Sequence, residues 1–146
     1  MNDKKELARE LFLQGYNCSQ AVFCAFAEDF GIDRDMALRV SASFGGGIGR
    51  MRETCGAVCG AAMVIGMTKG QTKPDDAEAK RQNYHAVQQL AEEFRRRNGS
   101  IKCAELLGAK KAPITDVPDA RTAEYYRQRP CLRMVESAVD ILLAAK

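Results

Sequence analysis

Six cysteines are the residues of this chain with the greatest chemical potential. They are Cys18, Cys24, Cys55, Cys59, Cys103 and Cys131, a large number for 146 residues. The first six residues lead into an amphipathic helix and not into the apolar core of a secretory signal, so we expect a cytoplasmic protein. In a reducing compartment, several cysteines indicate metal binding or redox chemistry rather than structural disulfides. No two of them have the CxxC spacing, which disfavours a zinc ribbon or a thioredoxin-type motif.

Four of these cysteines fall in the first turns of four different predicted helices. Each comes at or just after a residue suited to start a helix: Asn17 with Cys18, Thr54 with Cys55, Ser100 with Cys103, and Pro130 with Cys131. First turns have free backbone N–H groups and the positive end of the helix dipole, and both favour a thiolate over a thiol. If the four helix starts converge, they hold several thiolates in one site. Such a site suits a reactive dithiol, and it also suits an iron–sulfur cluster, whose four-cysteine shell is anionic.

The other two cysteines lie inside predicted helices. Cys24 belongs to the apolar run of residues 22–26, so we interpret it as a buried core residue. Cys59 lies four residues after Cys55 on the same helix face, where it could resolve a disulfide or add a ligand. A buried cysteine on a closely packed helix needs no chemical role, so both interpretations of Cys59 stay open.

A glycine-rich loop, residues 45–49, leads into a segment of very small residues that begins at Cys55. The loop lacks the lysine and hydroxyl of a phosphate-binding loop and follows a predicted helix rather than a strand, so a nucleotide site is disfavoured. Glycine lets other groups approach the backbone closely. We therefore take Gly46, Gly47 and Gly56 as candidate cofactor-binding residues, whose backbone approaches either the cysteine site or a tightly packed helix.

Apolar residues recur at helical spacing along the chain, and no stretch alternates convincingly with a period of two. The predicted helices cover residues 3–14, 17–31, 33–44, 55–67, 75–98, 101–107 and 120–128, and the last starts at Pro130. The stretch 108–118 has two prolines and no periodicity, so it is predicted to be a loop. We expect an all-α fold with a single domain over residues 1–146, a compact bundle of about five to seven helices with a glycine-rich loop.

Composition excludes several classes of partner. The formal net charge of +3 is too small to predict nucleic-acid binding, and the basic run 95–97 closes a helix, where cations meet the negative end of the dipole. The longest apolar run, residues 57–67, is far shorter than the roughly 20 residues that a membrane span needs. We therefore expect no nucleic-acid partner and no membrane span. Helix faces built from small residues are compatible with a homodimer.

Seen with these positions, the chain resembles the family of redox-active proteins named for a C…GCAxxG…C…C pattern. The matching segments are residues 15–22, 44–47 and 55–61 with two later single cysteines, so the resemblance covers nearly the whole chain. Transferred residue by residue, the family's defining cysteines fall on Cys18, Cys55, Cys103 and Cys131. The resemblance implies redox activity, and a similar domain is associated with a cytochrome of the split-Soret type, which favours an iron–sulfur cluster. The chain has no CxxCH motif, so covalent c-type haem is not expected.

We predict that these four cysteines converge in one site, which would act either as the redox-active group or as metal ligands. One mechanism is an iron–sulfur cluster that moves single electrons; the other is a dithiol, in which a low-pKa thiolate attacks a disulfide or oxidant and a second cysteine resolves it. Cys55 is the first candidate for that thiolate, and Arg50 and Arg52 just before it either lower its pKa further or face solvent. The redox partner is unidentified. The alternative is a non-enzymatic module, either a zinc site, which is less favoured than a cluster, or a helical interaction bundle.

Overall fold

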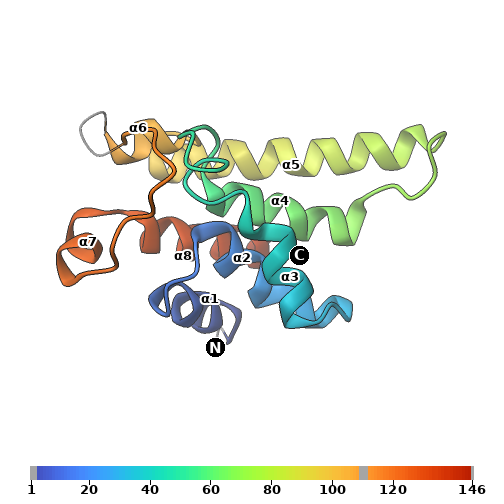
Figure 1. Cartoon of the computed structure of the whole chain (residues 1–146). Helices are drawn as coiled ribbons and strands as arrows, with labels where there is room; N and C mark the ends of the chain where they lie inside the picture. Colours follow the sequence, from blue (N-terminus) through green and yellow to red (C-terminus); the bar gives the residue numbers. More distant parts are fainter. Residues whose placement is uncertain (1–2, 109–111, 146) are drawn as a thin grey trace.

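The computed structural model describes residues 3–108 and 112–145, which form an all-α fold (Figure 1). Its elements are α1 (Asp3–Leu13), α2 (Cys18–Ala27), a 3₁₀ turn η1 (Glu28–Phe30), α3 (Arg34–Ala42), α4 (Gly56–Lys69), α5 (Ala77–Asn98), α6 (Cys103–Leu107), α7 (Ala123–Gln128) and α8 (Cys131–Ala144). The predicted all-α class is confirmed. Residues 112–118 are non-helical, as predicted for the loop, whereas residues 109–111 lie outside the described residues.

The expected number of helices is too low, because the described residues form eight α-helices. All eight lie at segments predicted to be helical, including the two short helices, α6 with five residues and α7 with six. Each has its own local boundary: Gly108 ends α6 with a φ of 87°, and the Thr122 side chain caps α7 by accepting from the Tyr125 N–H. These boundaries separate them from their neighbours.

The central helix of the fold is α2. Its sequence is apolar on nearly every side, and nine of its ten residues are buried. It contacts α1, α3, α4 and α8. Buried side chains of these helices form one hydrophobic cluster, to which α5 adds Leu90 and Phe94. Helices that begin against α2 therefore begin at the edge of a common core.

The close contact between α2 and α4 depends on two glycines of α4. A Cβ atom on Gly60 would lie 2.7 Å from the backbone oxygen of Ser19, and one on Gly56 would lie 3.3 Å from the Cβ of Cys18. The first distance is shorter than any ordinary contact and the second is tight, so α4 can approach α2 this closely only with glycine at these positions. From the end of α4 the chain turns back, and α5 runs along α4 (Figure 1).

The loop between α3 and α4 is held by its own backbone. The carbonyl groups of residues 45, 46 and 47 accept hydrogen bonds from the N–H groups of Arg50 (3.1 Å), Arg52 (3.1 Å) and Glu53 (2.8 Å). Arg50 and Arg52 have φ values of 61° and 64°, a left-handed conformation that costs free energy for a residue with a Cβ. The loop hydrogen bonds therefore compensate for an unfavourable backbone, and this backbone determines where the two arginine side chains go.

A short antiparallel pairing joins the end of this loop to the segment before α6. Thr54 and Lys102 form the bridge, the Cys55 N–H donates to the Ile101 carbonyl (2.7 Å), and the Cys103 N–H donates to the Glu53 carbonyl (2.6 Å). The pairing brings the start of α4 next to the start of α6.

Two predicted helix caps are wrong because of this pairing. Thr54 is in the bridge, and Cys55 itself takes the cap position of α4. Ser100 accepts a hydrogen bond from the Lys102 N–H (3.0 Å), and α6 begins only at Cys103. The backbone N–H and carbonyl groups of these two segments form hydrogen bonds with each other. Each helix therefore starts later than predicted.

None of the described helices combines the length and the apolar character needed to cross a membrane. The longest, α5, has 22 residues, but most of its surface is polar and carries Glu–Arg pairs three or four residues apart.

The contact at Gly60 predicts a large difference between two glycine substitutions in α4. Gly60→Ala would press a methyl group against the α2 backbone, and we expect it to lower the free energy of unfolding by about 1–3 kcal/mol, the usual cost of overpacking. The matched control is Gly66→Ala, whose Cβ would have no neighbour within 4 Å and which should raise stability by up to about 1 kcal/mol. Urea unfolding followed by circular dichroism measures both, and equal effects would contradict the proposed contact.

Candidate functional site

All four predicted site cysteines line one cavity, with a volume of about 440 Å³. Cys18 is the first residue of α2, Cys55 precedes α4, Cys103 is the first residue of α6, and Cys131 is the first residue of α8. Cys18, Cys55 and Cys103 are buried, and Cys131 is half-buried. The structure therefore brings together the four helix starts that the sequence singled out.

Cys18 and Cys131 form one pair within the cavity, close enough for each thiol to shift the pKa of the other. The start of α2 is fixed by a capping box, in which Asn17 and Gln20 exchange side-chain and backbone hydrogen bonds of 2.9 and 3.0 Å. Pro130 directly precedes α8, and α8 packs against α2. Two well-defined helix starts thus bring these thiols near each other.

The interaction between the two thiols makes their pKa values unequal. The neighbouring Cys18 thiol is the main cause that lowers the pKa of Cys131 to about 7, and the Tyr125 hydroxyl and the positive charges of Arg129 and Arg121 act in the same direction against burial. The neighbouring Cys131, together with burial, raises the pKa of Cys18 well above its ordinary value. At neutral pH, Cys131 is therefore the thiol that becomes a thiolate, and Cys18 retains its proton.

The bridge between Thr54 and Lys102 brings the backbones of the other two cavity cysteines, Cys55 and Cys103, next to each other. Burial raises the pKa of Cys55 to about 12, although the N–H groups of Ala57 and Val58 at the start of α4 lower it in part. Burial also raises the pKa of Cys103, against the positive charge of Arg52. The expectation that Cys55 carries the low-pKa thiolate is therefore wrong, because burial outweighs the helix N-terminus.

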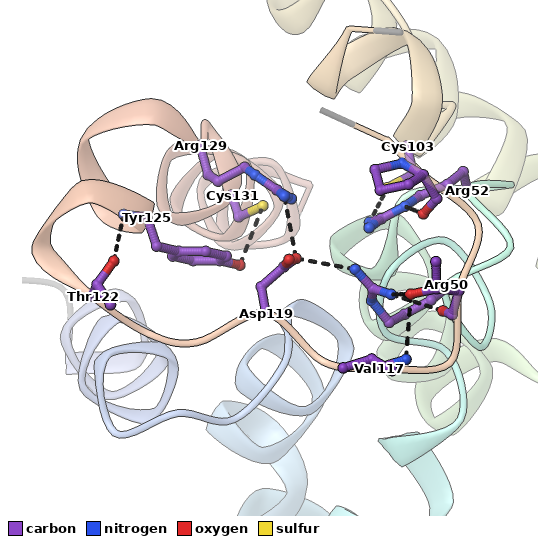
Figure 2. Close-up of polar contacts among 11 residues, drawn as sticks. Arg50, Arg52, Cys103, Val117, Asp119, Thr122, Tyr125, Arg129 and Cys131 are labelled. Carbon is purple, nitrogen blue, oxygen red and sulfur yellow. Dashed lines mark hydrogen bonds and ion pairs between the residues drawn. The ribbon is translucent and has the colours of Figure 1, made fainter. Parts of the chain in front are cut away.

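Arg52 forms a hydrogen bond with Cys103 and not with Cys55. Its Nη1 donates to the Cys103 sulfur at 3.6 Å, and its Nε donates to the Pro113 carbonyl at 3.2 Å (Figure 2). The side chain is almost completely buried, with 6% exposed. Its third donor group, Nη2, is buried and has no hydrogen-bond partner among the described residues. A guanidinium so deeply buried with a free donor is unusual, because buried charges are normally fully paired.

Asp119 joins the two sides of the cavity. One of its carboxylate oxygens accepts from Arg50 (3.1 Å), on the side of the glycine-rich loop, and from Arg129 (3.2 Å), next to Cys131 (Figure 2). Arg50 also donates to the carbonyl and hydroxyl of Thr115, at 2.7 and 2.6 Å. The segment of residues 113–122 is therefore fastened along the cavity by the arginines of the glycine-rich loop.

Tyr125 and Arg121 support the cavity from the side of α7. The Tyr125 hydroxyl approaches the Cys131 sulfur as a donor at 4.0 Å (Figure 2). The Arg121 guanidinium lies over the Tyr125 ring, 5.1 Å from its centroid, and donates to the carbonyls of Phe12 (2.7 Å) and Tyr16 (2.8 Å). Arg121 thus anchors α7 to the end of α1, and with it the hydroxyl that faces Cys131.

The three candidate glycines line the cavity, but each has a structural reason to be glycine. A Cβ on Gly47 would lie 2.6 Å from that of Cys103, one on Gly46 would meet the Arg50 side chain at 2.6 Å, and Gly56 faces α2. Gly46 and Gly47 also have positive φ. Their absent side chains give room to the cysteines and arginines of the site, and a role in holding a cofactor stays a prediction.

Cys59 and Cys24 do not line this cavity. The Cys59 thiol donates to the Thr54 carbonyl at 3.7 Å, and burial raises its pKa to about 11. Cys24 is buried in the core, as predicted, and burial raises its pKa as well. Of the two interpretations left open for Cys59, the geometry favours a protonated structural thiol.

Sequence reasoning did not find the contributions of Asp119, Arg121, Tyr125 and Arg129. Asp119 and Arg121 lie where the predicted loop 108–118 meets the predicted helix 120–128, and nothing in the sequence there indicates their partners. Arg129 gave a usable signal, because it lies two residues before Cys131, where its charge can act on the thiol. Tyr125 gave a weaker signal, because the sequence shows only that an aromatic residue lies six residues before Cys131.

Four cysteines around one cavity could also act as the ligands of a metal centre. Among residues 3–108 and 112–145, no three Cys, His, Asp or Glu side chains are grouped so that they could hold a metal ion. The donors are of a suitable type, since four thiolates are the usual shell of an iron–sulfur cluster. Their placement is not, and ligation of one centre would require side chains to reorient. Within the described residues, the four cysteines therefore do not form a preformed metal site.

The pKa of Cys131 predicts its reactivity. Its alkylation by iodoacetamide should accelerate as the pH rises through about 7 and level off above it, because the thiolate is the nucleophile. Cys55, with a pKa of about 12, stays protonated over this range and should react far more slowly. Site-resolved mass spectrometry across pH measures both rates, and faster modification of Cys55 than of Cys131 would contradict this assignment.

A pair of tyrosine variants tests the cause of this shift. Tyr125→Phe removes the hydroxyl that stabilises the Cys131 thiolate, so the midpoint of its alkylation profile should move upward by about half a pH unit, equivalent to less than about 1 kcal/mol. Tyr84→Phe, at an exposed position of α5, is the matched control and should leave the midpoint unchanged.

Comparisons with known proteins add one assignment. No curated protein and no solved structure matches the chain significantly. A family model described as "Putative redox-active protein (C_GCAxxG_C_C)" matches residues 16–145, a span that contains all four cysteines of the cavity. The resemblance seen in the cysteine and glycine motifs is thereby confirmed, and the chain belongs to this family.

Proposed function

We propose that Cys18 and Cys131 form a redox-active dithiol that converts reversibly to a disulfide. The observation that carries this proposal is that the two thiols lie in the wall of one cavity, close enough for each to shift the pKa of the other. Membership of a redox-active family supports it. Cys131 is the attacking residue, since a thiol with a pKa near the ambient pH combines a substantial thiolate fraction with good nucleophilicity.

The reaction is a two-electron exchange with a substrate disulfide, R–S–S–R. The Cys131 thiolate attacks one sulfur, so that a mixed disulfide Cys131–S–S–R forms and RS⁻ leaves. Cys18 transfers its proton to this RS⁻, and the resulting Cys18 thiolate attacks the Cys131 sulfur and displaces the second RS⁻. The two protein cysteines are oxidised to a disulfide, and the substrate disulfide is reduced to one thiol, RSH, and one thiolate, RS⁻, which takes its proton from water.

The neighbouring groups have separate roles in this scheme. Tyr125 and Arg129 stabilise the Cys131 thiolate before attack, the first by its hydroxyl and the second by its charge. Cys55 and Cys103 remain protonated at neutral pH, because burial raises the pKa of both thiols. They are therefore not the initial nucleophiles.

Oxidation of the reduced protein with bis(2-hydroxyethyl) disulfide tests the dithiol. We expect a Cys18–Cys131 cross-link, located by peptide mapping and reversed by dithiothreitol. Cys131→Ser should abolish both the mixed disulfide and the cross-link, while Cys18→Ser should accumulate the mixed disulfide on Cys131. The control is Cys59→Ser, which removes a thiol outside the cavity and should leave the cross-link intact. No reversible loss of thiols, or a cross-link that excludes Cys131, would refute the proposal.

A second candidate function is electron transfer by an iron–sulfur cluster. It is favoured by the specific observation that all four family cysteines line one cavity, a donor set of the right number and type. It requires the rearrangement of side chains described above. A zinc site has the same donors and is the weaker form of this candidate.

Anaerobic purification distinguishes these possibilities. A cluster predicts a brown protein with visible absorption and bound iron, both lost in Cys55→Ser, because all four thiolates would be ligands. A colourless protein after reconstitution with iron and sulfide would reject the cluster. Stoichiometric zinc, with loss of helicity on chelation, would instead support a structural metal site.

A further inference from the structure

The buried guanidinium of Arg52 is the feature that the dithiol chemistry leaves unexplained. Only 6% of the residue is exposed, Arg52 is among the residues that line the cavity, and its Nη2 has no partner among the described residues. Nε and Nη1 are occupied by the Pro113 carbonyl and the Cys103 sulfur. A charged donor left free in this position loses hydration without compensation, which costs about 1–3 kcal/mol or more unless another acceptor binds.

The charge of the cavity wall points to the kind of acceptor. Four arginines line the cavity, Arg50, Arg52, Arg121 and Arg129, against only two aspartates, Asp116 and Asp119. Asp119 already accepts from two of these arginines, and Arg121 donates to two backbone carbonyls. Arg52 is the cavity arginine whose hydrogen bonds involve no carboxylate and which keeps a buried donor free. An anion is the ligand that such a surplus of positive charge favours.

The size of the cavity and the burial of the thiols limit the ligand further. A volume of about 440 Å³ is within the range of small-molecule sites, which runs from about 300 to 1,000 Å³. Cys18 is 9% exposed and Cys131 is half-buried, and both line this cavity. This placement favours the disulfide of a small molecule that enters the cavity.

We infer that the substrate is a small, negatively charged disulfide, with an anionic group bound by Nη2 of Arg52 while its sulfurs meet Cys131 and Cys18. This inference rests on the proposed dithiol function and adds the substrate class. The chemistry is the exchange already given: Cys131–S⁻ and R–S–S–R form Cys131–S–S–R and RS⁻, and Cys18 then completes the protein disulfide. The groups R carry the negative charge, and Arg52 neither gains nor loses a proton in the reaction.

Three symmetric disulfides of similar size test the charge preference. They are 3,3′-dithiodipropionate, which is anionic, bis(2-hydroxyethyl) disulfide, which is neutral, and cystamine, which is cationic. We expect the reduced protein to react with the anionic disulfide about tenfold or more faster than with the neutral one, as one charge-assisted hydrogen bond would give. Cystamine should react more slowly than both. The rates are compared with those of free cysteine under the same conditions, which removes the intrinsic differences among the reagents.

Two arginine variants test whether Arg52 causes the preference for the anionic disulfide. Arg52→Gln should reduce the anionic-to-neutral rate ratio to near one, whatever happens to each rate separately. Arg39→Gln, which removes the same charge from an exposed position of α3, should leave the ratio unchanged. A ratio that is retained in Arg52→Gln, or lost equally in both variants, would overturn the role of Arg52. Circular dichroism reports whether each variant folds.

An inhibition experiment on the wild type tests the preference for an anion without any substitution. Suberate has the length of dithiodipropionate but no sulfur, and 1,6-hexanediamine is its cationic counterpart. Suberate should slow the reaction of the wild type with the neutral disulfide, whereas the diamine should not. If the neutral disulfide does not react at all, the dithiol function itself fails; if it reacts but no anion preference or suberate inhibition is found, only the substrate class fails.

Discussion

The approach of α4 to α2 at Gly56 and Gly60 is the constraint on which the rest of the site depends. Without it, the start of α4 could not lie against the start of α2, and Cys55 could not share a cavity with Cys18. The same approach brings the preceding loop into reach of α6, where the bridge between Thr54 and Lys102 adds Cys103. The glycines of α4 therefore act through their lack of a side chain, because this determines how closely the helix starts that carry the cysteines can approach one another.

Burial and helix N-termini have opposite effects on the four thiols, and their balance differs between Cys55 and Cys131. A helix start favours a thiolate, but removal from water by burial favours a thiol. At Cys55 burial dominates and raises the pKa to about 12. At Cys131 a neighbouring thiol, a tyrosine hydroxyl and two arginines reverse the outcome. The special position of Cys131 thus arises from groups on α2, α7 and the preceding segment more than from its own helix.

The helices and the four site cysteines could be predicted because both depend on local patterns. The spacing of apolar residues in α8 and the start of this helix after Pro130 can be recognised in the sequence. The same holds for Asn17, which caps the helix that begins at Cys18. The caps at Thr54 and Ser100 could not be predicted correctly, since those segments are used in a pairing between distant parts of the chain. For the same reason, Arg52 was associated with Cys55, its neighbour in sequence, whereas in space it contacts Cys103. Local pattern placed the thiols on helix starts but could not say which thiol would meet which charge.

The pairing of Cys18 with Cys131 has a consequence for the order in which the protein can acquire its chemistry. Cys18 belongs to the second helix, and Cys131 opens α8, which follows every other described helix. Because a chain is synthesised from its N-terminus and distant contacts form only after a large loop closes, this pair can meet only after the intervening helices have been made. During synthesis, Cys18 lacks Cys131 as a neighbour until the last described helix has been made. The lowered pKa of Cys131 is thus tied to completion of the fold, because the groups that lower it come from distant parts of the chain.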